Sequence, residues 1–189
     1  MKGAENMSTA ENKTAGFFNV KAGDTFKVAG IEFIKFPDVD GMTPVVAKNI
    51  LFNSRFGDNN DLRSSDALKR LKEEILPKIC IAIGEENACA FPTDLTTWDG
   101  LKPYGIMEEK ISFVTMDFYR ANVVIFDKYP VRGWWWLATP DTAQPHGDPD
   151  WILCVSPSSD ISSGGYDYID GGVRPVLYFK SSIFGSSEN

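Results

Sequence analysis

The sequence predicts an α+β fold of short, mostly antiparallel strands with one main helix. Two observations favour this class. Residues 25–28 (TFKV) and 31–36 (IEFIKF) are joined by Ala29-Gly30, which is typical of a β-hairpin with a tight glycine turn. One stretch alone has a clear helical period, and helices do not alternate with strands as they would in a βαβ protein.

The main helix is predicted from an apolar repeat at helical spacing, made by Leu68, Leu71, Ile75 and Ile79. Ser64 or Ser65 is its expected N-cap, because a serine hydroxyl can accept from a free backbone N–H of the first turn. Pro77 lacks an N–H and is expected to end or bend the helix near its last turn.

Shorter elements are expected along the rest of the chain. Residues 38–41 resemble the opening of a calcium loop, but the later ligands are missing and the segment is interpreted as a turn. Strands are predicted at 44–47, 111–114, 134–140, 151–155 and 173–179, a helical turn at 116–121 and an apolar element at 123–126. Residues 52–61 and 85–105 are interpreted as loops, with Trp98 and Tyr104 leaning onto the core.

Three consecutive tryptophans dominate the last third of the chain. Because indole rings are costly to leave in water, at least two are expected in the core. In a strand, Trp134 and Trp136 would share one face and Trp135 the other. Arg174 is predicted to fix the last strand to a nearby carboxylate or carbonyl through its planar guanidinium, a structural role.

Length and charge limit the classes of protein. The 189 residues suit one domain, expected at 17–182, between a disordered tail at 1–16 and a second tail at 183–189. The net charge is −7 and Lys and Arg do not cluster, which argues against a nucleic-acid partner.

No apolar run approaches the roughly 20 residues that cross a bilayer, so membrane insertion is not expected. The first sixteen residues lack the apolar segment of a secretory signal. The protein is therefore expected to stay in the cytoplasm until it is released, for example by lysis, or to be part of a phage particle. Whether a native leader is missing stays open.

Catalytic, metal and cofactor sites are not predicted. The three cysteines have no CxxC spacing and there is one histidine, which argues against zinc; buried free thiols are expected, with one disulfide left open. No nucleotide-binding motif is present, so no cofactor is expected. His146 has acidic neighbours and could act as a general base, but the adjacent proline and glycine favour a loop tip.

Two polar segments, residues 141–150 and 156–170, are predicted to be binding loops on a rigid base. Tyr166 and Tyr168 are expected to be large, rigid contact residues beside adaptable polar ones. The candidate ligand-binding residues are Asp141, Thr142, His146, Asp148, Asp150, Ser158, Ser159, Asp160, Ser162, Tyr166, Asp167 and Tyr168.

Two segments in the last third of the chain resemble a known sequence frame. Residues 135–140 read WWLATP and residues 172–177 read GVRPVL, with the apolar segment 151–155 between them. This frame resembles that of a family of uncharacterised domains from Firmicutes and their phages, WWL(R/A)(S/T)P followed by GVRP(A/V)L. Residues 65–76, 95–100 and 110–115 are similar to the family's helix and middle section, and the resemblance spans roughly residues 17–180.

The resemblance implies a C-type-lectin-like fold, shared with the sulfatase-modifying-factor group and with the variable proteins of diversity-generating retroelements. It implies a non-catalytic module that displays variable loops, over 141–150 and 156–170, to a protein or glycan ligand on a bacterial surface. Calcium-dependent sugar binding is not expected, because Gln144-Pro145-His146 lacks the carboxylate of the lectin motif.

Two alternatives remain open at this stage. One is an enzyme of the sulfatase-modifying-factor type, although Cys154 lies in an apparent core strand and does not look activated. The other is a structural component of a phage particle, in which the loops are only surface.

Overall fold

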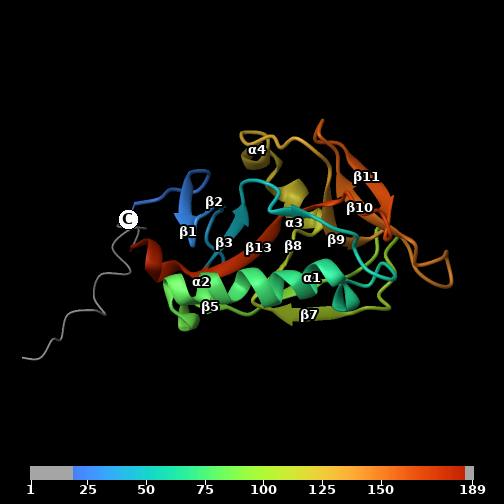
Figure 1. The fold of residues 1–189 in the computed structure, drawn as a ribbon, viewed down its shortest axis with the longest axis horizontal. Coiled ribbons are helices and arrows are strands. Elements are labelled where there is room, and N and C mark those ends of the chain that lie inside the picture. The colour runs from blue at the N-terminus through green and yellow to red at the C-terminus, as the bar shows by residue number, and fades with distance from the viewer. Residues whose placement is uncertain (1–18, 186–189) are drawn as a thin grey trace, which may run out of the picture.

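A computed structural model describes residues 19–185 and confirms the α+β class, with mostly antiparallel strands and one main helix (Figure 1). The tail expected at 1–16 lies outside the described residues, as do residues 186–189. Ile183 and Phe184 are buried in the core, so packing continues past the boundary expected at residue 182.

The largest sheet is built around the last long strand of the chain. Its order is β1-β2-β3-β13-β5, and β8 also pairs with β13. The predicted hairpin opens this sheet, with Val28 opposite Ile31 and a turn of positive φ at Ala29 and Gly30. The strands are β1 (Thr25–Val28), β2 (Ile31–Lys35), β3 (Met42–Ala47), β5 (Ala88–Cys89), β8 (Ile111–Phe113) and β13 (Pro175–Lys180).

A second sheet carries the tryptophan strand, in the order β11-β10-β9-β12-β4. All its pairs are antiparallel except β9 with β12. Its members are β4 (Phe52–Asn53), β9 (Trp135–Pro140), β10 (Trp151–Val155), β11 (Ile161–Gly165) and β12 (Gly172–Val173); β6 (Phe91–Asp94) and β7 (Ile106–Glu109) form a separate ribbon.

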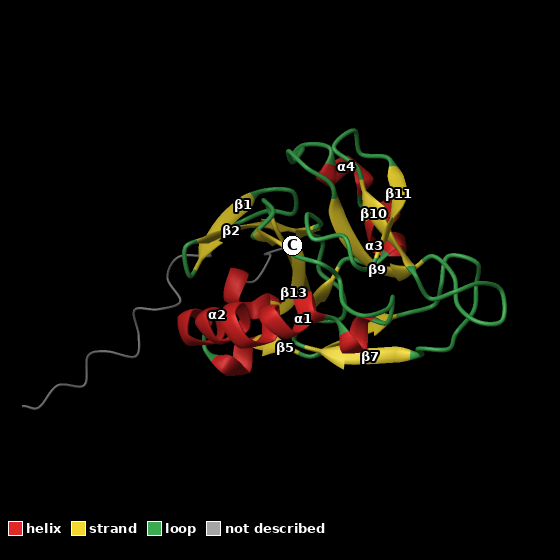
Figure 2. Cartoon of the chain, turned by 45° about the vertical axis from the view of Figure 1, so that its right-hand side comes forward, coloured by secondary structure: helices red, strands yellow, loops and turns green. Residues whose placement is uncertain are grey.

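The main helix packs along the large sheet (Figures 1 and 2). It begins with Ser65, whose hydroxyl accepts from the Leu68 N–H at 3.2 Å, and it ends at Gly84, where φ is +88°. Its segments are α1 (Asp66–Arg70), a π-helical turn (Leu71–Ile75) and α2 (Leu76–Ile83). The predicted N-cap and apolar face are both confirmed.

Of the two effects expected of Pro77, an end or a bend of the helix, the end is wrong, because α2 continues to Ile83. The turn just before Pro77 is π-helical, and the Leu76 N–H bonds to the Leu71 carbonyl. Pro77 has no N–H to donate, and the wider π-helical turn changes the pattern of backbone hydrogen bonds just before it. The helix therefore continues past Pro77 to Ile83.

Two shorter helices, α3 (Met116–Ala121) and α4 (Val123–Phe126), cover the opposite side of the tryptophan strand. Thr115 caps α3 by accepting from the Phe118 N–H at 3.2 Å. The region expected to be irregular at 85–105 holds β5 and β6, and the predicted loop at 156–170 holds β11. These strands were missed because they are short and two of them contain proline or glycine in place of apolar alternation.

The tryptophans divide the core as predicted. Trp136 is fully buried in the cluster beneath the main helix, with Trp134 packed against it at a ring-centroid distance of 4.5 Å. Trp135 is buried in the second cluster, against Tyr119 and Phe126. Trp98 is half exposed, so its expected packing onto the core is wrong, whereas Tyr104 does pack there.

Glycine is required where the closing segment passes the tryptophan strand. A Cβ on Gly171 would lie 2.1 Å from Nε1 of Trp136, and the nearest backbone atom to a Cβ on Gly172 would be the Trp134 carbonyl oxygen, at 2.8 Å. Neither contact is possible for a real side chain, so the GG pair and the tryptophans are packed as one unit. No helix in the described part of the chain is both long and apolar enough to cross a membrane.

Candidate functional site

The hairpin of β10 and β11 separates the predicted site residues into two groups. Trp151 pairs with Gly165 at one end and Val155 with Ile161 at the other. At roughly 3.4 Å per residue, the five-residue strand β10 places these ends about 14 Å apart. We call the Trp151 side the loop end (residues 97–100, 141–151 and 165–170) and the Val155 side the turn end (residues 156–160).

Most of the predicted residues lie at the loop end, and three lie at the turn end. The loop end holds Asp141, Thr142, His146, Asp148, Asp150, Tyr166, Asp167 and Tyr168; the turn end holds Ser158, Ser159 and Asp160. Ser162 is exposed on β11 between them. The predicted residues are therefore divided between the two ends of the β10–β11 hairpin.

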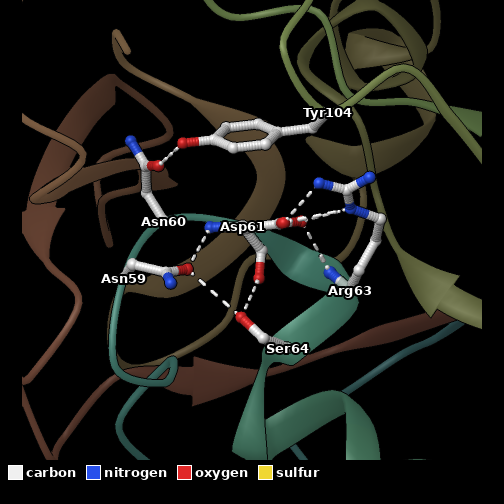
Figure 3. Close-up of polar contacts among 6 residues, drawn as sticks. All are labelled: Asn59, Asn60, Asp61, Arg63, Ser64 and Tyr104. Atoms are coloured by element: carbon white, nitrogen blue, oxygen red, sulfur yellow. Dashed lines mark hydrogen bonds and ion pairs between the residues drawn. The ribbon is translucent and has the colours of Figure 1, made fainter. Parts of the chain in front are cut away.

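A buried asparagine ties the loop end together. Asn60 is fully buried, and its Nδ2 donates to the carbonyls of Thr142 at 2.8 Å and Trp151 at 3.0 Å. Its own N–H donates to the Pro149 carbonyl at 3.0 Å. The Tyr104 hydroxyl donates to Oδ1 at 2.6 Å (Figure 3), so all hydrogen-bonding groups of the amide are used.

The residues beside Asn60 hold its loop in place. Oδ1 of Asn59 accepts from the Asp61 N–H and the Ser64 hydroxyl, while the Arg63 guanidinium donates to both carboxylate oxygens of Asp61 (Figure 3). Arg63 also lies over the Tyr104 ring, 5.5 Å from its centroid. The loop 58–61 is therefore tied to residues 142–151 through Asn60, and its two acids pair with Arg55 and Arg63.

Asp99 is the centre of a second hydrogen-bond network at the loop end. Its carboxylate accepts from the hydroxyls of Thr97 at 2.5 Å and Thr142 at 2.7 Å. Nδ1 of His146 lies 2.9 Å from the same oxygen that Thr142 bonds. Two predicted residues, Thr142 and His146, thus meet at a carboxylate that the sequence analysis did not select.

This network changes the acidity of two carboxyl groups in opposite directions. Hydrogen bonds, first from Thr97 and then from Thr142 and His146, hold the pKa of Asp99 well below its usual range. Burial, and to a smaller extent the charge of Asp99, raises the pKa of Asp141. Asp99 is therefore a stable anion that fixes the loop, and a fixed charge of this kind is suited to orienting a ligand and not to exchanging protons near neutral pH.

Large apolar side chains are exposed at the loop end. The exposed fractions are 52% for Trp98, 43% for Trp151, 47% for Tyr168 and 78% for Ile169. The Tyr168 ring lies 6.4 Å from the rings of both Trp151 and Trp134. The Trp98 N–H bonds to the Pro140 carbonyl at 2.8 Å, which places its backbone beside the end of β9. Such residues are costly in water unless something covers them.

The two tyrosines chosen from the sequence differ in their surroundings. Tyr168 is exposed, whereas Tyr166 is half-buried and packs against the core cluster. The Tyr166 backbone also bridges two segments, because its N–H donates to Asp150 and its carbonyl accepts from Phe56. Tyr168 is therefore available to a ligand, and Tyr166 is mainly a packing residue.

Cys154 does not have the surroundings of a reactive thiol. It is buried in β10, and burial raises the pKa of its thiol to about 11. All three cysteines are free, with Cys80 and Cys89 half-buried. Within residues 19–185, no group of at least three His, Cys, Asp or Glu could hold a metal ion.

Three residues that build the loop end were not predicted from the sequence. Asn60 lies in a segment interpreted only as a polar loop, and its burial depends on distant contacts that no local pattern reveals. Asp99 and Trp98 lie in the stretch 95–100 that carried part of the family resemblance, and that match was the one available signal. Comparison of the chain with protein-family models, curated proteins and solved structures finds no match.

Proposed function

We propose that this chain is a non-catalytic ligand-binding module. A rigid lectin-like frame presents the loop end to a protein or glycan on a bacterial surface, as in the receptor-binding variable proteins that retroelements diversify. The observation that carries the proposal is the group of exposed aromatic and apolar side chains, Trp98, Trp151, Tyr168 and Ile169, over a network of fixed hydrogen bonds.

The chemistry of this surface supports recognition. Tryptophan and tyrosine offer flat apolar faces with few rotatable bonds, so they contact a ligand at a low cost in conformational entropy. The loop end also carries five acidic residues, Asp99, Asp148, Asp150, Asp167 and Asp170. Carboxylates accept hydrogen bonds from sugar hydroxyls, and they attract the Lys and Arg side chains of a protein partner.

The alternative of an enzyme of the sulfatase-modifying-factor type has less support. Such chemistry needs an accessible thiolate, and the buried Cys154 is protonated at neutral pH because its pKa is about 11. The lectin-like assignment itself rests on the terminal sequence frame, together with the α+β arrangement of the strands and helix.

The direct test is binding of the fluorescently labelled protein to an array of bacterial surface polysaccharides and to intact Firmicutes cells, before and after protease treatment of the cells. We expect Trp151→Ala and Tyr168→Ala each to weaken binding roughly ten-fold or more, as central aromatic residues of an interface do. The Tm should change by no more than about 2 °C, because both side chains are exposed.

Ile81→Ala is the matched control, because Ile81 is a large exposed apolar residue on α2, away from the loop end. Its binding should equal that of the wild type. Loss of binding on protease treatment identifies a protein ligand and retention identifies a glycan. If all three variants bind equally well, or if binding falls only where the protein unfolds, the loop end is not the binding surface.

A further inference from the structure

A second feature lies at the turn end and is independent of the proposed ligand surface. Arg174 stands between β12 and β13, where the chain passes from one sheet to the other, and only 2% of it is exposed. Its Nε donates to the Ala47 carbonyl at 2.7 Å, which confirms the predicted structural role. Its Nη2 is buried and has no hydrogen-bond partner.

The charge of Arg174 is also not neutralised by an acid. Among the described residues no carboxylate lies within ion-pair distance of it; Asp127 and Asp160, the acids near its neighbour Tyr119, are exposed, and Asp160 accepts instead from Ser158. The guanidinium carbon lies 5.0 Å from the Trp135 ring centroid and 5.2 Å from that of Phe126. Aromatic faces offset part of the cost of burying a cation but leave its edge donors unused.

A small cavity meets this side chain. Its volume is about 10 Å³, close to the least that admits a single water-sized particle. Arg174, Tyr119, Tyr129, Trp135, Ser156 and Ser159 are among the residues that line it. The Tyr119 hydroxyl donates to the Ser159 carbonyl at 3.0 Å, which holds the turn 156–160 over the cavity.

We propose that this cavity is a binding site for one small monatomic anion of the chloride class, held by the guanidinium of Arg174. An anion would satisfy the free Nη2–H group and neutralise the buried charge together, whereas a water molecule would satisfy only the hydrogen bond. Chloride is larger than a water molecule, so the proposal includes an outward shift of the surface turn 156–160 when the anion binds.

The burial of Arg174 agrees with this arrangement, because burial lowers the pKa of the guanidinium to about 10. The group is still charged at neutral pH. The site would also stabilise the turn 156–160, in which Ser159 has the positive φ of 70° that is uncommon outside glycine.

The experiment compares thermal unfolding of the full chain in sodium chloride and in sodium gluconate at equal ionic strength. Gluconate is too large for the cavity. For the wild type we expect chloride to raise the Tm by about 4 °C at ten times its dissociation constant. Arg174→Met should lose this difference. Arg120→Met, which removes an exposed arginine from α3, should keep it.

Bromide soaked into wild-type crystals makes the proposal testable even if Arg174→Met does not fold. An anomalous peak within hydrogen-bonding distance of Nη2 supports the site. A water molecule there without bromide, or a chloride effect of equal size in all three proteins, would overturn the proposal, because the salt effect would then be general screening.

Discussion

At the scale of single residues, Asn60 determines the shape of the loop end. One amide joins the segments around Thr142, Pro149 and Trp151 to Tyr104, and every one of these contacts is long-range in sequence. Buried polar groups that are fully satisfied stabilise one arrangement of the loops, because each competing arrangement leaves a donor or acceptor unpaired.

We predict that Asn60→Ala lowers the free energy of unfolding by about 3 kcal/mol, since several buried partners lose their hydrogen bonds together. Chemical denaturation measures this change. Asn53→Ala is the control, because Asn53 is exposed at the end of β4, and it should change stability by less than about 0.5 kcal/mol. Equal effects of the two substitutions would show that Asn60 has no special structural role.

Asp99 gives a pH-dependent prediction at the same scale. Its pKa is lowered by hydrogen bonds from Thr97, Thr142 and His146, so the folded state binds a proton less readily than the unfolded state. The stabilisation is fully present above the unfolded pKa near 3.9 and is lost as pH falls below that value toward the folded pKa. Thermal unfolding should therefore separate wild type from Asp99→Asn at pH 7, with the wild type more stable, and the gap should narrow below pH 4.

Thr96→Ala tests the neighbouring network as a control for this pH effect. Thr96 bonds Asp94 and not Asp99. The pH-dependent difference in Tm caused by Asp99→Asn should therefore be the same whether or not the protein also carries Thr96→Ala. A gap that stays constant down to pH 2.5 would mean that the carboxylate of Asp99 does not make these bonds in solution.

At the scale of elements, strong local patterns were predictable and short elements were not. The hairpin at 25–36 and the main helix follow from turn chemistry and apolar period, and both are confirmed. The strand β11 has the sequence ISSGG and is stabilised by its pairing with β10, which no local propensity indicates. The helix passes Pro77 because the preceding turn is π-helical, an adjustment that a proline alone does not reveal.

The start of the main helix supplies the prediction at this scale. Ser65 accepts from the Leu68 N–H and donates to the Phe56 carbonyl at 2.5 Å, and it is buried. Ser65→Ala should lower the free energy of unfolding by about 2 kcal/mol, from the lost cap and the unpaired carbonyl. Ser64→Ala, an exposed neighbour, should cost less than half of that in the same denaturant titration. If Ser64→Ala lowers the free energy of unfolding more than Ser65→Ala does, Ser64 and not Ser65 is the N-cap of the helix.

At the scale of the whole molecule, two buried hydrophobic clusters support the two ends of the β10–β11 hairpin. Trp135 and Trp136 face opposite clusters, and the GG segment passes against them with no space for a side chain. The sequence predicted the tryptophan faces, and eight of its candidate binding residues lie together at the loop end. It did not predict that Ser158, Ser159 and Asp160 lie at the other end of the β10–β11 hairpin, because this separation depends on β11.

The measurement that tests the central claim most directly is sequencing of this locus across individual isolates or a metagenome. We predict that substitutions concentrate in codons of the loop end, especially 98–100, 141–151 and 166–170, beside unchanged Asn60, Trp135, Trp136 and Gly171. Substitutions spread evenly over the chain, or gathered in the tryptophan frame, would contradict a diversified binding surface on a rigid base.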